Sequence, residues 1–286
     1  MTARPVFVTP FEERLLQGLT GQRLIVRTSG VEDIPIIGEV ATQLQCNLEA
    51  VILETTSSVT SLPFEDRWKA VPLLVHAPEL GRVSHLLSHL PVIRGMSLRL
   101  MLPTEGEENY TSLRILSSLG IPSGFLLRGD TADWEQLLDL ASYYYFTFAN
   151  HAPIAPLDNF GDHYLPGGGC SFGSAYLEDP ATIYYHLNQE GEVALSQEDL
   201  ERGNILYPSL EALGEAGVQT DLEGRTQPLS RLFLSPGPCP MCPALKLCRG
   251  GVAGDDGNVP DGCSGFFSEL MGMVEEYQAM RNGRGG

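Results

Sequence analysis

Residues 23–54 read RLIVRTSGVEDIPIIGEVATQLQCNLEAVILE and contain two apolar runs separated by a helical pattern. The runs 23–28 and 48–54 are rich in Leu, Ile and Val, which is typical of strands buried on both faces of a parallel sheet. Between them, apolar residues recur at helical spacing over Val31–Gln45. The stretch therefore predicts a strand–helix–strand unit, in which the helix connects two parallel strands.

The same order repeats along the first half of the chain. Further strands are expected at Val71–His76, Ser97–Leu102 and Gly124–Arg128, and further helices at Glu79–Leu90, Glu107–Leu119 and Ala132–Tyr144. The last of these helices is preceded by Asp130-Thr-Ala-Asp133, whose acidic side chains favour a helix N-terminus. The repeat predicts an α/β protein with a parallel sheet or a partial (β/α) barrel.

The pattern changes after residue 150. The stretch Gly161–Gly173 is rich in glycine and predicts a loop. Beyond it we expect a β-hairpin of Thr182–Leu187 and Glu192–Leu195 with a turn ending in Gly191, a short helix Ser209–Leu213 capped by Ser209, and a C-terminal helix Ser264–Met280. The predicted organisation is a barrel-like domain over 1–160, a second domain over 161–280 and a disordered tail over 281–286.

Four of the six cysteines lie within 25 residues, as Cys239-x2-Cys242-x5-Cys248-x14-Cys263. Prolines around the first two stiffen the backbone, and glycines before the fourth allow a loop to fold back. Four thiolates at this spacing can surround one metal centre, either an iron–sulfur cluster or a structural zinc ion. Two disulfides are the alternative, but such frameworks are expected in short secreted chains.

Several of these features together resemble a SPASM domain, the C-terminal iron–sulfur extension of radical-SAM enzymes that modify peptides and proteins. The likeness covers about the last 110 residues. It rests on the hairpin from Ile183 to Ser196, on Glu201-Arg-Gly-Asn-Ile205, on Ser209-Leu-Glu-Ala-Leu213 and on Cys239-x2-Cys242-x5-Cys248. The family pattern ordinarily binds two auxiliary [4Fe–4S] clusters.

The departures from this pattern fall into two groups. Ser196 and Val252 stand where the family has cysteines, and the cysteine expected near Ala181 is also missing. In the family these positions bind the first auxiliary cluster, whereas Cys239, Cys242, Cys248 and Cys263 correspond to the second. The resemblance thus implies one retained cluster.

The motif that binds the SAM-cleaving cluster, CxxxCxxC, is also absent. The equivalent loop would be Thr28-Ser-Gly-Val-Glu-Asp-Ile34, and Cys46 stands alone. The resemblance therefore implies a degenerate radical-SAM barrel followed by a SPASM-like domain, as in stand-alone GeoRSP-type SPASM proteins. It predicts one [4Fe–4S] cluster, no SAM, and a protein that is not itself an enzyme.

The function implied is that of an accessory protein in a RiPP-type peptide-maturation system. It would bind a radical-SAM enzyme or its precursor peptide, and would support docking or relay electrons. Two alternatives stay open: an independent enzyme that uses the barrel mouth and the loop Asp158–Cys170, and a structural zinc protein. Asp162 and His163, with Asp158 and Cys170, match no known metal spacing. His85 and His89 are four apart on a predicted helix and could share a metal, but without the glutamate of an HExxH motif a surface or packing role is expected.

Composition limits the partners. The chain has 18 Lys and Arg against 36 Asp and Glu, a net charge of −18, which repels nucleic acids and anionic membranes and favours a basic protein or peptide. Neither an apolar signal-peptide core nor an 18-residue apolar run is present, so a cytoplasmic location is expected. Thiols stay reduced there and are free to bind metal.

Overall fold

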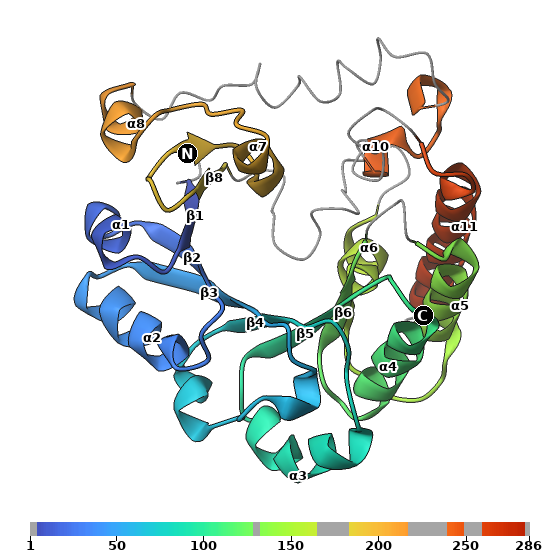
Figure 1. Cartoon of the computed structure of the whole chain (residues 1–286). Helices are drawn as coiled ribbons and strands as arrows, with labels where there is room; N and C mark the ends of the chain where they lie inside the picture. Colours follow the sequence, from blue (N-terminus) through green and yellow to red (C-terminus); the bar gives the residue numbers. More distant parts are fainter. Residues whose placement is uncertain (1–4, 128–131, 165–182, 217–238, 249–258, 284–286) are drawn as a thin grey trace. The chain divides into compact units, whose positions relative to one another are not determined.

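The computed structural model describes residues 5–127, 132–164, 183–216, 239–248 and 259–283. These residues form an α/β structure whose strands make one nine-stranded, mostly parallel sheet, with the order β7-β6-β5-β4-β3-β2-β1-β8-β9 (Figure 1). Strands β1 to β7 are therefore neighbours in their chain order. The chain divides into two compact units, residues 1–100 with 181–225 and residues 101–180 with 226–286.

The first unit begins with alternating strands and helices. These are β1 (Val6–Pro10), α1 (Glu13–Gly18), β2 (Arg23–Thr28), α2 (Asp33–Gln43), β3 (Asn47–Glu54), β4 (Leu73–His76) and α3 (Val83–Ile93), with short 3₁₀ helices at Val59–Ser61 and Asp66–Ala70. Strands β1 to β4 pair in parallel. Val51, Ile52 and Leu53 are consecutive and all buried, so both faces of β3 are covered, as the apolar run predicted.

The predicted hairpin is present and extends this part of the sheet. Strand β8 (Tyr184–Leu187) pairs antiparallel with β9 (Val193–Ala194), and its other edge pairs in parallel with β1. The short helices α7 (Gln197–Glu201) and α8 (Leu210–Ala216) follow. Ser209 caps α8 as predicted, because its Oγ accepts a hydrogen bond from the Ala212 N–H at 3.3 Å.

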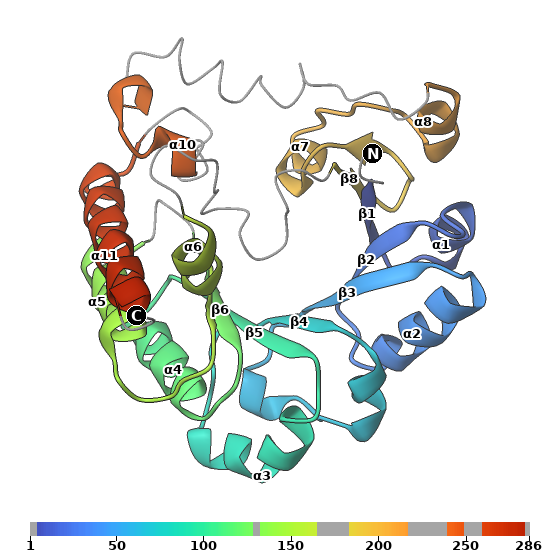
Figure 2. The ribbon, with the colours of Figure 1, turned by 180° about the vertical axis from the view of Figure 1, so that it is seen from behind.

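The second unit contains the remaining elements, and β5 (Leu98–Pro103) crosses the boundary between the units. They are α4 (Glu107–Ser118), β6 (Ser123–Leu126), α5 (Trp134–Phe146), β7 (Ile154–Ala155), α6 (Leu157–His163), a 3₁₀ helix at Cys239–Met241, α10 (Leu245–Cys248) and α11 (Cys263–Gly283). Helices α4, α5 and α11 lie side by side (Figure 2). Helix α5 begins at the acidic stretch that predicted a helix start, and Asp133 caps it by accepting a hydrogen bond from the Gln136 N–H.

Several elements differ from the sequence prediction. Strands β1 and β7 and helices α1, α6, α7 and α10 were not expected, and α6 overlaps the start of the predicted glycine-rich loop. Gly161 lies inside α6, where a Cβ would come within 2.9 Å of the Tyr145 ring. The glycine therefore permits close helix packing rather than a turn. The rest of that loop, including Cys170, lies outside the described residues.

The C-terminal helix is confirmed and runs to Gly283, so residues 281–283 of the predicted tail are helical. The two compact units interleave along the sequence, whereas the predicted domains 1–160 and 161–280 follow one another; that division stays a prediction. Within the described ranges, no helix is both long enough and apolar enough to cross a bilayer.

Candidate functional site

Three of the four clustered cysteines lie in one compact stretch of backbone. Cys239 begins a single 3₁₀ turn, which the Cys242 N–H closes by donating to the Cys239 carbonyl oxygen at 3.0 Å. The chain turns again when Leu245 N–H donates to the Cys242 carbonyl at 3.1 Å, and α10 then ends at Cys248. The prolines between these cysteines thus accompany tight turns, as the sequence predicted.

The fourth cysteine, Cys263, is the first residue of α11 and follows a glycine with special geometry. Gly262 has a φ of +86°, and a Cβ there would come within 3.0 Å of Trp134 Cδ1. The Trp134 ring also packs against Phe266 of α11, with ring centroids 5.1 Å apart. A glycine at 262 therefore lets the chain pass close to Trp134 of α5 and brings Cys263 to a rigid helix end.

The four thiols are shielded from solvent to different degrees. Cys239 and Cys263 are buried, and Cys242 and Cys248 are half-buried. Burial raises the pKa of the Cys239 thiol, with a further contribution from Cys242. Burial also raises the pKa of Cys263, and the nearby Cys239 and Cys242 raise it further. Cys242 lies near the start of α11, since its Sγ is 3.8 Å from the Oγ of Ser264, the residue after Cys263.

Thiolates are the ligands that soft metal centres prefer. None of the five described cysteines forms a disulfide, so the disulfide alternative has no counterpart in these ranges. Thiolates that would repel one another are suited to a cation or a cluster, which compensates their charge. Among the described residues, however, no three His, Cys, Asp or Glu side chains already stand at ligating positions around one point. Residues 249–258, which connect Cys248 toward Cys263, lie outside the described ranges.

Ser196, at a position where the resemblance expects a cysteine, has a local structural role. Its Oγ accepts a hydrogen bond from the Asp199 N–H at 3.0 Å and donates to Asp199 Oδ2 at 2.7 Å. The side chain thus caps α7. Val252 and Ala181 lie outside the described residues.

A strand precedes the loop Thr28–Ile34, which the resemblance compares with the binding loop of the SAM-cleaving cluster. The first strand is β1, not β2, and Phe11 and Glu12 separate it from α1. This loop has no cysteine either. Cys46 lies elsewhere in the first unit, and its thiol donates to the Leu19 carbonyl oxygen at 3.4 Å.

The other candidate ligands serve in packing or at the surface. His85 and His89 lie on α3, where His89 packs against Phe64 with ring centroids 5.7 Å apart. Asp162 of α6 forms an ion pair with Arg281 at 2.5 Å, and His163 contacts the Asn159 carbonyl oxygen at 3.1 Å.

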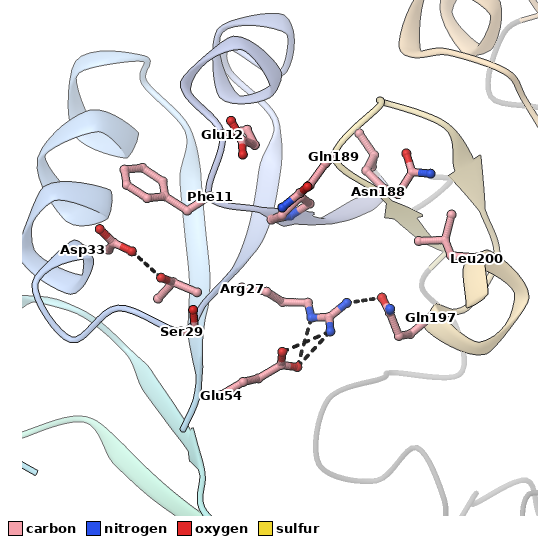
Figure 3. Close-up of a pocket in the computed structure, with 13 residues that line it drawn as sticks. Phe11, Glu12, Arg27, Ser29, Asp33, Glu54, Asn188, Gln189, Gln197 and Leu200 are labelled. Atoms are coloured by element: carbon pink, nitrogen blue, oxygen red, sulfur yellow. Dashed lines mark hydrogen bonds and ion pairs between the residues drawn. The ribbon is translucent and has the colours of Figure 1, made fainter. Parts of the chain in front are cut away.

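A cavity of about 420 Å³ lies in the first unit at the carboxyl ends of β1, β2, β3 and β8 (Figure 3). The loops after these strands and helix α7 line it. The residues involved are Pro10, Phe11, Glu12, Arg27, Thr28, Ser29, Asp33, Glu54, Leu187, Asn188, Gln189, Gln197 and Leu200. In open parallel sheets this edge is where ligands bind, because loops and side chains converge there.

Arg27 is the only cation among these lining residues, and it is held on two sides. Its Nη2 donates to Glu54 Oε1 at 2.9 Å and its Nε donates to the same oxygen at 3.1 Å. Its Nη1 donates to Gln197 Oε1 (Figure 3). Gln197 is itself oriented by donating to Glu201 at 3.0 Å.

His76 lies beside this group, since it is opposite Glu54 in the register of β3 and β4. Its Nε2 is buried and has no hydrogen-bond partner among the described residues. Burial lowers the pKa of His76 to about 4; Glu54 opposes this shift, and Arg27 adds to it. The imidazole is therefore neutral at pH 7.

Arg27, Glu54 and His76 were not among the site residues predicted from the sequence. Each stands in the last two residues of a strand, and charged residues at strand ends are the pattern that would have indicated them. Neither a scan against protein-family models nor a search of the curated proteins finds a significant match to this chain.

Proposed function

We propose that the chain is an iron–sulfur accessory protein, in which Cys239, Cys242, Cys248 and Cys263 hold one [4Fe–4S] cluster. The observation that carries the proposal is the concentration of four cysteines in one segment, where Cys239 and Cys263 are buried and their pKa values are raised by burial and by neighbouring thiols. A cluster with four thiolate ligands supplies one-electron transfer or structural support.

The protein's own residues would hold such a group in a defined environment. Cys263 is fixed by α11, which packs against α5 through Phe266 and Trp134. The turns at Cys239 and Cys242 set the direction of the other thiols. With four protein ligands the site would be closed, which suits support or electron relay rather than substrate binding.

The partner that we propose is a radical-SAM enzyme of a peptide-maturation system, or its precursor peptide. The resemblance of the last 110 residues to SPASM domains motivates this partner. The order of β1 to β7 in the sheet is sequential, as in (β/α) barrels, and does not reverse as in doubly wound folds. This order supports our proposal that the first half is a degenerate radical-SAM barrel.

The first test concerns catalysis. Because the chain has no CxxxCxxC, we expect the reconstituted, reduced protein to release no 5′-deoxyadenosine from SAM. The measurement is chromatography of the reaction mixture, with a radical-SAM enzyme of intact motif as the positive control. Sustained release over many turnovers would contradict the accessory role.

The second test concerns the partner. If the gene stands beside one that encodes an enzyme with CxxxCxxC, the two proteins should co-elute when purified together without oxygen. The Cys263→Ala variant should co-elute less, if the cluster supports the docking surface. An isolated gene, or a neighbouring enzyme that never associates with the chain, would count against the proposal.

A further inference from the structure

The cavity at the carboxyl ends of β1, β2, β3 and β8 is separate from the cysteine site in sequence and is lined by residues of the first unit alone. Its volume, about 420 Å³, lies within the ordinary range of small-ligand pockets. The proposed metal site makes no use of it. The kind of ligand that the cavity would bind therefore follows from its own lining residues.

Hydrogen-bond acceptors predominate in the lining. The lining contains three carboxylates, those of Glu12, Asp33 and Glu54, and one guanidinium, that of Arg27. Glu54 and Gln197 already engage this guanidinium on its Nε, Nη1 and Nη2 atoms. The cavity thus has an excess of negative charge that its one cation does not neutralise.

The three carboxylates differ in the hydrogen bonds and ion pairs that they already form. Asp33 accepts a hydrogen bond from the Thr28 hydroxyl at 2.5 Å, and Glu54 is paired with Arg27. Glu12 is exposed, and in the part of the chain that the structure describes its carboxylate has no hydrogen bond or ion pair. Glu12 is therefore the acceptor that a cationic ligand can take without breaking an existing contact.

The remaining walls are apolar. Pro10, Phe11, Leu187 and Leu200 line the same cavity, and Leu187 is buried while the other three are half-buried. An aliphatic stem can lie along such surfaces while a charged end reaches the carboxylates. A lysine or arginine side chain has this combination, and the net charge of −18 raises the local concentration of cations.

We propose that this cavity binds an aliphatic chain that ends in a cation, an ammonium or guanidinium group, with Glu12 as its charged acceptor. The ligand is either a basic side chain of a peptide or a free alkyl amine, which share this chemistry. The inference does not rest on the metal at the cysteine site.

The experiment uses the full-length protein and three capped tripeptides, Gly-Lys-Gly, Gly-Arg-Gly and Gly-norleucine-Gly, followed by ligand-observed NMR. We expect saturable binding of the lysine and arginine peptides, weakened by salt, and none of the norleucine peptide, which lacks only the charge. Glu12→Gln should weaken binding of the lysine peptide by about five- to tenfold, as expected for the loss of one charged acceptor. Glu39→Gln, which removes an exposed carboxylate of α2 outside the cavity, should leave it unchanged.

A parallel titration with 1,5-diaminopentane distinguishes a peptide side chain from a free alkyl amine. Tighter binding of the lysine peptide would identify a peptide as the ligand, and tighter binding of the diamine would identify a free amine; either result supports binding of a cationic aliphatic chain. Equal binding of the norleucine peptide would overturn the proposal. So would equal affinities for Glu12→Gln and Glu39→Gln, provided that both variants retain the wild-type circular dichroism spectrum. These outcomes say nothing about the metal site, so the two proposals fail independently.

Discussion

Replacing Cys263 by alanine should remove the metal while leaving the fold intact. We propose this thiol as a metal ligand. Loss of a group that only orients a metal ligand lowers metal affinity by about 10- to 100-fold, so loss of a ligand should lower the affinity at least as much. We therefore expect iron content after anaerobic reconstitution to fall by about tenfold or more in Cys263→Ala. Alanine is the best helix former, so α11, which begins at residue 263, should persist.

The matched control is Cys46→Ala. Cys46 is the one described cysteine outside the cluster, and its thiol bonds to the Leu19 carbonyl in the first unit. This variant should retain its iron, its brown colour and its circular dichroism spectrum. If Cys263→Ala kept a full complement of iron, or if Cys46→Ala lost as much, the assignment of the ligands would be wrong.

Acidification should destabilise the first unit through His76. The folded-state pKa of about 4 lies below the ordinary value of 6.5, so between these values the unfolded chain binds a proton that the folded chain does not. Stability from this group is complete above pH 6.5 and is lost as the pH falls toward 4. The loss in the free energy of unfolding amounts to about 2 kcal/mol at pH 5 and approaches about 3 kcal/mol at lower pH.

The measurement is urea unfolding of the wild type and of His76→Gln at pH 7 and pH 5. The variant should lose about 2 kcal/mol less than the wild type between these two pH values, because it has no imidazole to protonate. His85→Gln, which replaces an exposed histidine of α3, controls for the loss of a histidine as such. Identical losses in the wild type and His76→Gln would show that His76 is not the group responsible.

Much of the sheet could be predicted because its strands are continuous apolar runs. Strand β2 matches the expected residues 23–28, and β3 differs from its expected range by one residue. β1 was missed because its five residues end in Thr9 and Pro10 near the start of the chain, where the apolar run is short. β7 has only two residues and is defined by its pairing with β6, which no local pattern specifies.

The candidate cysteines could be named from their spacing, because ligand spacing is a local property of the sequence. Their surroundings could not, since the contact between Gly262 and Trp134 joins residues far apart in the chain. The cavity was missed for a similar reason. Arg27, Glu54 and Gln197 come from three separate segments, and only the parallel pairing of β2 with β3 and of β1 with β8 brings their strands to one edge.

The proposed cluster is tested by the metal and acid-labile sulfide content of the wild-type chain, purified without oxygen. We expect a brown protein with about four irons and about four sulfides per chain, held by Cys239, Cys242, Cys248 and Cys263. One tightly bound zinc ion per chain with no labile sulfide would contradict it, and would identify the four cysteines as a structural zinc site instead.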